Sequence, residues 1–146
     1  MTIYCVIPAY RARETVVAVV ADALEYAEVV VVVDDGCPQA SGDVVEAAFP
    51  GSERVRVLRH DRNRGVGAAM KTGIGYAIDD GADAIVKIDA DGQMNCSYIP
   101  LIAELFASDP SLVCIKGNRF FDSTVLKVMP KRRLLGNALL SLTAKF

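Results

Sequence analysis

Short apolar runs alternate along the chain with longer segments in which apolar residues recur at helical spacing. The apolar runs have the length of buried strands, and the clearest of them is a run of five valines at 29–33. Strands are predicted at 3–7, 29–33, 55–58, 84–88 and 112–116, and helices at 15–27, 43–49, 67–80 and 99–107, with a last helical stretch that begins at Pro130. This alternation predicts an α/β fold, with a Rossmann-like, mostly parallel sheet and helices on both faces.

Three local signals refine this prediction. Arginines alternate with apolar residues around 55–58, which indicates a strand near the edge of the sheet. Ser41 stands where it could cap the helix at 43–49. Gly81 follows the helix at 67–80 and is its natural C-terminal stop.

Polar residues gather directly after three of the predicted strands. Pro8, Ala9 and Tyr10 follow the first strand, the segment 34–36 follows the second, and the segment 89–93 follows the fourth. Ligands of open parallel sheets bind outside the carboxyl ends of the strands. We therefore expect the functional site at this edge of the sheet.

The sharpest chemical signal is the pair Asp89 and Asp91 at the end of the fourth strand. Alternate residues that leave a strand can aim two carboxylates at one point, and hard oxygen ligands on a short loop suit Mg²⁺ or Mn²⁺. Gln93 could add a carbonyl oxygen. The alternative interpretation of the pair is an acidic surface turn.

A second acidic pair, Asp34 and Asp35, ends the valine strand. These carboxylates could accept hydrogen bonds from a base or a ribose, or they could be turn residues that cap the following loop. The segment 63–67 has the sequence Asn-Arg-Gly-Val-Gly and joins a strand to a helix, so that its backbone N–H groups could approach an anion or a ring. No phosphate loop of the ATPase kind occurs in the sequence.

Charge is distributed unevenly over the 146 residues, of which 52% are apolar. Residues 1–115 carry 9 basic and 17 acidic side chains, whereas residues 116–146 carry 7 basic and 1 acidic. A basic segment on an acidic body indicates an anionic partner for that segment, and the alternative is a solvated helix face. The length fits one domain.

The four cysteines form no CxxC pair and no metal-ligand spacing with histidine. Buried free thiols in a reducing cytosol are therefore expected. The only histidine is His60, which excludes a multi-histidine metal site. Any serine- or cysteine-dependent mechanism with a histidine base would have to rest on this residue.

These motifs, in this order and spacing, resemble the family 2 glycosyltransferases, which have the nucleotide-sugar-binding fold called GT-A. The resemblance covers residues 3 to about 120 and rests on the segments 6–10 with Glu14, 32–36, 63–69 with Gly73, and 89–93. Two segments resemble those of one branch of the family, the enzymes that make polyprenyl-phosphate sugars, such as dolichyl-phosphate mannose synthase. They are Asp-Ala-Asp-Gly-Gln at 89–93 and the later Gly117-Asn118-Arg119.

The resemblance implies a role for each motif. The nucleotide pocket would be lined by Pro8, Ala9, Tyr10, Glu14, Asn63, Gly67 and Lys71, with Asp34 or Asp35 on the base or ribose. The divalent ion would be held by Asp89, Asp91 and Gln93. Arg119, with Arg132 or Arg133, would meet the phosphate of the acceptor. The catalytic set is thus Asp89, Asp91, Arg119 and Arg133. Arg11 and Cys37 depart from the family pattern, which often has Asn or Asp at the first position and Ser at the second.

The implied activity is an inverting, metal-dependent transfer of a sugar from a nucleoside-diphosphate sugar to a polyprenyl-phosphate or glycan acceptor, with Mg²⁺ or Mn²⁺ as cofactor. No general base is apparent among the residues named, which favours an ionised phosphate acceptor or a base elsewhere. We expect no nucleic-acid partner. The expected location is the cytoplasm, with the inner face of the membrane as a site for the basic segment.

The whole chain, 1–146, is interpreted as the nucleotide-sugar-binding part of a GT-A domain. It stops within the apolar pattern of its last helix, at Leu134, Leu135, Ala138, Leu139 and Leu142, so we expect truncation at the C-terminus.

Three alternatives stay open. A sugar-nucleotide pyrophosphorylase would require a glycine-rich loop after the first strand, where 8–13 has no glycine. A phospho-receiver module would place its acid pair after the first strand and not the second. A nucleotide-sugar-binding fragment without activity would keep the same motifs.

Overall fold

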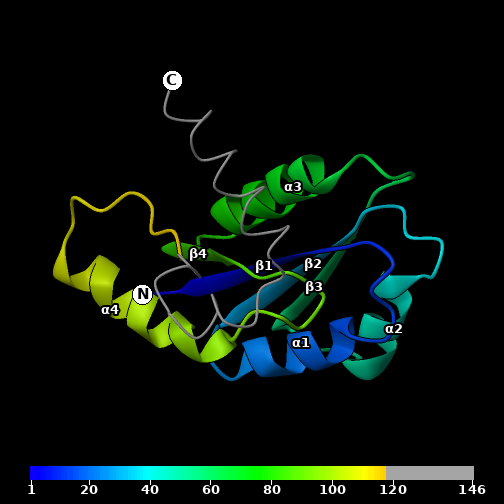
Figure 1. Ribbon diagram of the computed structural model, residues 1–146, viewed down its shortest axis with the longest axis horizontal. Coiled ribbons are helices and arrows are strands. Elements are labelled where there is room, and N and C mark those ends of the chain that lie inside the picture. Colours follow the sequence, from blue (N-terminus) through cyan, green and yellow to red (C-terminus); the bar gives the residue numbers. More distant parts are fainter. Residues whose placement is uncertain (118–146) are drawn as a thin grey trace, which may run out of the picture. The chain divides into compact units, whose positions relative to one another are not determined.

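The computed structural model describes residues 1–117, and its regular part lies within 1–111 (Figure 1). Four strands form one sheet in the order β3-β2-β1-β4: β1 (Ile3–Ala9), β2 (Val29–Asp34), β3 (Val55–Arg59) and β4 (Ala84–Lys87). All neighbouring strands are parallel. The strand order reverses between β1 and β4, because β2 and β3 extend the sheet on one side of β1 and β4 pairs on the other.

Helices cover both faces of the sheet. They are α1 (Val16–Leu24), α2 (Ser41–Ala48), α3 (Val66–Asp79) and α4 (Ile99–Ser108), with the 3-10 turn η1 (Cys96–Tyr98) directly before α4. Figure 1 shows α1, α2 and α4 on one face and α3 on the other. The predicted fold class, a Rossmann-like parallel sheet between two helical layers, is confirmed.

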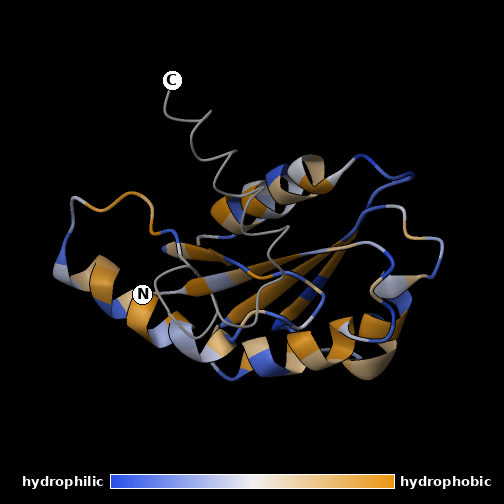
Figure 2. Ribbon diagram, in the orientation of Figure 1, coloured by the Kyte–Doolittle hydropathy of each residue, from blue (hydrophilic) through white to orange (hydrophobic). Residues whose placement is uncertain are grey.

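The core follows from the alternation of side chains along buried strands. Cys5 and Ile7 of β1 pack with α1, α2 and the start of α4, whereas Tyr4 and Val6 face α3. The side chains of the valine strand β2 alternate between the two faces in the same way, so β2 is apolar on both. In Figure 2 the strands are coloured mostly as hydrophobic. Each fully buried valine contributes about 1.5–3 kcal/mol relative to an exposed one, so β2 anchors both layers.

Most of the predicted boundaries agree with the structure to within one or two residues. β3 is an edge strand, as the arginine pattern predicted, and Gly81 follows α3 with a φ of +88°. The prediction of a helix over 15–27 was too long, since α1 ends at Leu24.

Two other predictions were wrong. Residues 112–116 take no regular secondary structure, because apolar composition alone does not supply a partner strand. Ser41 is the first residue of α2 and makes no side-chain cap. Within residues 1–117, no helix combines the length and apolar character that a membrane crossing requires.

Helix α3 approaches the sheet closely at Gly73. A Cβ atom at this position would lie 2.4 Å from Val6 Cγ1 and 3.1 Å from Val33 Cγ2. We expect Gly73→Ala to lower the free energy of unfolding by about 1–3 kcal/mol, the usual cost of overpacking a filled core. Gly75→Ala is the matched control in the same helix, because nothing lies within 4 Å of its added Cβ.

Alanine at position 75 should stabilise α3 by about 0.5–1 kcal/mol through its better helix propensity. Urea denaturation of the two variants therefore should give shifts of opposite sign. Equal gains in stability at both positions would show that α3 does not touch the sheet at Gly73.

Candidate functional site

The carboxyl ends of the strands form a continuous edge. Ala9 of β1 lies beside Asp34 of β2, which lies beside Arg59 of β3. The ladder continues one step further, since the Asp35 N–H donates to Ala9 O at 3.0 Å and the His60 N–H donates to Asp34 O at 2.9 Å. The polar segments after β1 and β2 therefore lie side by side, as the sequence predicted.

β4 brings the third polar segment, 89–93, to the same edge. Val6 pairs with Lys87, and the Ile88 N–H donates to Val6 O at 3.1 Å, so Asp89 leaves the sheet beside the end of β1. The ends of β1 and β4 flank the point where the strand order reverses. This is the place where parallel sheets bind their ligands.

Asp34 is buried and hydrogen-bonded within the chain. Its Oδ1 accepts the Cys37 N–H at 2.7 Å and its Oδ2 accepts the Gly42 N–H at 2.6 Å. Gly42 belongs to the first turn of α2, so Asp34 satisfies a free helix donor and places a negative charge at the positive end of the helix. The cap expected from Ser41 is supplied by Asp34, while Ser41 Oγ accepts the Ala12 N–H at 3.2 Å.

Asp35 is also buried, with three internal donors. Its Oδ1 accepts from His60 Nδ1 at 2.6 Å and from the Arg64 N–H at 2.9 Å, and its Oδ2 accepts the Gly65 N–H at 2.8 Å. Burial raises the pKa of the Asp35 carboxyl, but the hydrogen bonds from His60 and the two backbone N–H groups outweigh burial and hold the pKa below its ordinary value. Both acids thus fit the alternative of loop-holding residues, and a contact with base or ribose stays a prediction.

His60 was missed as a site residue by the sequence analysis. Its Nε2 lies 2.9 Å from Thr72 Oγ1 of α3, and its ring is only 4% exposed. The signal was present, because His60 directly follows β3 at the same edge as the acids, and the strand-end rule applies to the third strand as to the others.

The predicted cation ligands lie on an exposed turn after β4. The Asp91 Oδ1 accepts the Gln93 N–H at 3.0 Å, and Gly92 has a φ of +74°. Lys87 Nζ lies 2.5 Å from Asp89 Oδ1, with both side chains more than a third exposed. Within residues 1–117, no three His, Cys, Asp or Glu side chains form a group suited to a metal ion. The turn therefore offers at most the two carboxylates of Asp89 and Asp91, and Asp89 is paired with Lys87.

The end of β1 carries the residues predicted to line a nucleotide pocket. Ala9 is buried, Pro8 is half-buried, and Tyr10 is exposed with the Arg11 guanidinium 5.4 Å from the centre of its ring. The Arg11 N–H donates to Cys37 Sγ at 3.0 Å, so the two positions that depart from the family pattern touch each other.

The Cys37 sulfur lies in a polar environment at the start of α2. Burial raises the pKa of its thiol, but hydrogen bonds to the Ser41 hydroxyl and from the N–H groups of Arg11, Ser41 and Gln39 lower it below its ordinary value. A thiol at this position is therefore a stronger acid than the buried Cys5, whose pKa is raised by burial.

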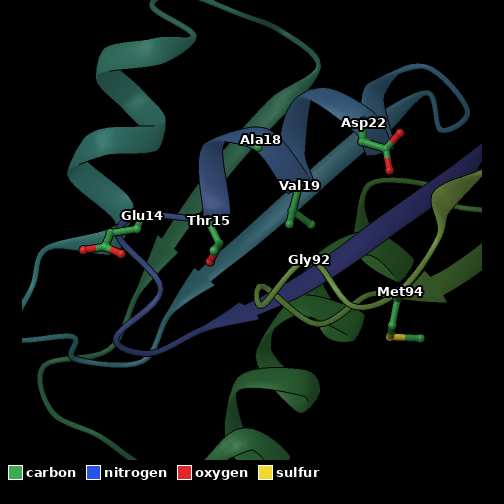
Figure 3. Close-up of a pocket in the computed structure, with 7 residues that line it drawn as sticks. All are labelled: Glu14, Thr15, Ala18, Val19, Asp22, Gly92 and Met94. Atoms are coloured by element: carbon green, nitrogen blue, oxygen red, sulfur yellow. The ribbon is translucent and has the colours of Figure 1, made fainter. Parts of the chain in front are cut away.

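Two hollows open beside these residues. The first, of about 310 Å³, lies between α1 and the turn after β4 and is lined by Glu14, Thr15, Ala18, Val19, Asp22, Gly92 and Met94 (Figure 3). Thr15 Oγ1 donates to Ala90 O at 2.6 Å and ties the turn to the start of α1. The second, of about 300 Å³, is lined by Asp34, Gly36, Cys37, Ala40, Asp43, Arg59, His60 and Asp61. Of the predicted site residues, Glu14 lines the first hollow and Asp34 lines the second, whereas Asp89 and Asp91 line neither.

The remaining predicted residues are exposed or lie outside the described part. Asn63 and Gly67 are exposed on the loop and first turn that lead into α3, and Lys71 is exposed further along α3. The Asn63 Oδ1 accepts the Gly65 N–H at 3.0 Å. Arg119, Arg132 and Arg133 lie outside residues 1–117, so the structure says nothing of the acceptor residues.

Comparison with known proteins identifies the family to which the residues of this edge belong. The family model described as glycosyl transferase family 2 matches residues 4–144, nearly the full chain. The chain belongs to this family. The prediction from the motifs is confirmed at this level, and the match includes every strand-end segment described above.

Three relatives have names that refer to polyprenol or polyprenyl phosphates. A UDP-N-acetylglucosamine–dolichyl-phosphate N-acetylglucosaminyltransferase of Methanococcus voltae is 29% identical over 95% of this chain and 60% of its own length. A polyprenol monophosphomannose synthase of Mycolicibacterium smegmatis is 31% identical over 89% of this chain and 49% of its own. An undecaprenyl-phosphate mannosyltransferase of Micrococcus luteus is 29% identical over 71% of this chain and 44% of its own.

These relatives agree with the branch that the Asp-Ala-Asp-Gly-Gln segment indicated. The chain spans between 44% and 60% of their lengths.

Proposed function

We propose that this chain is the donor-binding part of a glycosyltransferase that moves a sugar from a nucleoside-diphosphate sugar to a polyprenyl-phosphate acceptor. The observation that carries the proposal is the family match over 4–144 together with the position of Asp89 and Asp91 at the carboxyl edge of the sheet. The names of the relatives support the acceptor class.

A divalent cation, Mg²⁺ or Mn²⁺, would be held by Asp89 and Asp91, with Gln93 as a further oxygen donor. The turn fits such an ion, because Mg²⁺ is commonly bound through one or two carboxylates together with phosphate oxygens and water. The bound ion would neutralise the charge that develops on the departing nucleoside diphosphate.

The chain's own residues have separate tasks in this proposal. Lys87 must release Asp89 when the cation binds, and its ammonium group is then free beside the diphosphate. Asp35 and His60 hold the backbone of the loop before α3. Asn63 of this loop and Gly67 of the first turn of α3 are proposed to meet the nucleotide. The positive end of α3, at Val66, points its free N–H groups toward this loop and favours an anion there.

Attack by the acceptor from the face opposite the leaving group would invert the configuration at the sugar. A phosphate acceptor is ionised at pH 7 and needs no general base, whereas a sugar hydroxyl would need one. Ala9 and Pro8 crowd the end of β1 without a titratable side chain, and the buried Asp34 and Asp35 are already hydrogen-bonded. The ends of β1 and β2 therefore offer no free base for a hydroxyl nucleophile, which supports a phosphate as the acceptor.

The basic segment 116–146 would serve the acceptor at the inner face of the membrane. Its 7 basic and 1 acidic residues are set against an acidic body. Arg119 and Arg133 are the proposed phosphate contacts, because a guanidinium can hold a phosphate through two parallel hydrogen bonds. Each basic residue near an anionic lipid surface adds about 1 kcal/mol of attraction.

The proposal is tested by calorimetric titration of the chain with UDP, GDP and dTDP, with and without Mn²⁺. At least one nucleotide should bind, and Mn²⁺ should strengthen its binding. Asp91→Ala should lower the Mn²⁺-dependent affinity at least tenfold, a loss of about 1.4 kcal/mol or more. Asp91 is exposed and makes one local hydrogen bond, so the variant should keep the unfolding temperature of the parent.

Asp79→Ala is the matched control, because this exposed aspartate ends α3 at the opposite edge of the sheet. It should bind nucleotide as the parent does. Unchanged Mn²⁺-dependent binding in Asp91→Ala would remove the cation site from the proposal, and no binding of any nucleotide would remove the donor site.

A further inference from the structure

A buried polar network links three elements behind the candidate site. Thr72 of α3 contacts the sole histidine, His60, at Nε2, and Asp35 contacts the same ring at Nδ1. The side chains of His60 and Asp35 are both 4% exposed. The network joins α3 to the end of β3 and, through Asp35, to the end of β2.

The direction of the hydrogen bonds in this network can be deduced. An ionised carboxylate has no proton to give, so the proton between Asp35 and His60 belongs to Nδ1. In the neutral ring, Nε2 then accepts from the Thr72 hydroxyl, and in the charged ring Nε2 donates to it. Both ionisation states of His60 satisfy both contacts, so the network holds the ring in one orientation throughout.

The composition resembles a Thr-His-Asp catalytic arrangement, but the geometry does not serve catalysis. A general base must reach the substrate within hydrogen-bond distance. Both nitrogens of His60 are occupied inside the protein, and the ring is almost fully covered. The network therefore acts on the site through Asp35 and not by touching a substrate.

Asp35 transmits the position of the ring to the backbone of the neighbouring loop. Its carboxylate accepts the N–H groups of Arg64 and Gly65, which directly follow Asn63 and precede α3. If His60 gave no proton, the buried carboxylate would keep only these two donors. It would turn to recover the third bond, and the two backbone N–H groups would move with it.

We propose that His60 is a positioning residue for donor binding: the Nδ1–H donor of its ring fixes Asp35 in the orientation that sets the loop at 63–65 for the nucleotide. This inference rests on the proposed function, because it assigns the loop to the nucleotide site. It adds His60 to the site as a residue that affects nucleotide affinity only through the side chain of Asp35.

Two substitutions of His60 separate the contacts of its ring. The amide of asparagine stands about as far from the backbone as Nδ1, so His60→Asn can still donate to Asp35 but cannot reach Thr72. The amide of glutamine stands about as far out as Nε2, so His60→Gln can reach Thr72 but leaves Asp35 without its third donor. Thr72→Val removes the outer contact alone and keeps the histidine.

Three measurements on the 146-residue chain test the inference. The first is the ¹⁵N spectrum of the imidazole, which is unambiguous because the chain has one histidine. The second is the urea midpoint of each variant. The third is the dissociation constant for UDP and GDP in the presence of Mn²⁺.

The spectrum of the parent should show a protonated Nδ1. His60→Gln should weaken nucleotide binding at least tenfold, whereas His60→Asn and Thr72→Val should stay within about threefold of the parent, although all three variants lose stability. A purely structural histidine would make affinity follow the urea midpoint instead.

Each contrary outcome has a distinct meaning. An unprotonated Nδ1, or equal affinities in His60→Gln and His60→Asn, would overturn the positioning role while leaving the proposed function intact. Failure of the parent chain to bind any nucleotide would overturn the proposed function, and the ¹⁵N spectrum and urea midpoints would still report whether the network exists.

Discussion

Replacing Asp35 with asparagine should lower the free energy of unfolding by about 3 kcal/mol at neutral pH. The carboxylate is buried and accepts three hydrogen bonds, from His60 and from the backbone of Arg64 and Gly65. An amide offers one acceptor oxygen, and its NH₂ group would face at least one of these donors. Breaking a buried, charge-assisted network in this way costs about 3–5 kcal/mol when no partner replaces the lost group, and the amide oxygen recovers part of that.

The effect of Asp35→Asn should depend on pH with a definite sign. The folded-state pKa of Asp35 lies below its unfolded value, so its contribution is complete above the unfolded value of about 3.9 and is lost as the pH falls through the folded value. The difference between the parent and Asp35→Asn should therefore be full at about pH 5 and above and should shrink as the solution is acidified below about pH 4. Urea denaturation at a series of pH values measures it.

Asp79→Asn is the control for this experiment, since Asp79 is an exposed aspartate on the last turn of α3. It should change stability little at any pH. A difference between the parent and Asp35→Asn that stayed constant from pH 6 to pH 3 would mean that the Asp35 charge is not what the network requires.

Of the glycine-to-alanine substitutions in the described chain, Gly36→Ala should lower the free energy of unfolding the most. Gly36 has a φ of +61°, and its added Cβ would lie 2.3 Å from Arg62 C and 2.5 Å from Arg62 Cα. The clash is with backbone, which cannot turn aside as a flexible side chain can. The left-handed conformation costs about 1–2 kcal/mol and the overpacking about 1–3 kcal/mol more, so a loss of about 2–5 kcal/mol is expected.

Gly81→Ala separates the two costs of the Gly36 substitution. Gly81 has a φ of +88°, but nothing lies within 4 Å of its added Cβ, so only the conformational cost of about 1–2 kcal/mol applies. Urea midpoints give both losses. If Gly36→Ala lost no more stability than Gly81→Ala, the loop after β2 would not rest on the backbone of residue 62.

The layers of this fold could be predicted from the sequence because they depend on repeated, local signals. The valine run of β2, the alternation in β3 and the helical spacing of α3 each specify one element over several residues. The segment 112–116 has the same apolar character as these strands, yet it forms none in the structure. A strand needs a partner, and its partner is not encoded in its own residues.

The edge of the site could be located from the sequence, but its internal contacts could not. The strand-end rule placed Asp34, Asp35 and Asp89 together correctly. The partners of their carboxylates lie up to 30 residues away in the chain, as with Asp35 and Gly65. Lys87 is the exception: it stands two residues before Asp89, and the two-residue repeat of a strand puts both on one face, so this ion pair was within reach of sequence reasoning.

The pairing of β4 with β1 has a consequence for the order in which the site assembles. Ile3 pairs with Ala84, whereas every other strand pair joins neighbours along the chain. A pairing between strands far apart in the sequence loses the conformational entropy of closing a long loop before its contacts stabilise the fold. Such pairings therefore form late in folding. During synthesis from the N-terminus, β1, β2 and β3 can form their ladder before Asp89 and Asp91 have left the ribosome. The two parts of the site edge should therefore form at different times. The ends of β2 and β3, which hold the loop before α3, come from early pairings between strands that are neighbours in the sequence. The acidic turn at 89–93 joins them only when β4 pairs with β1.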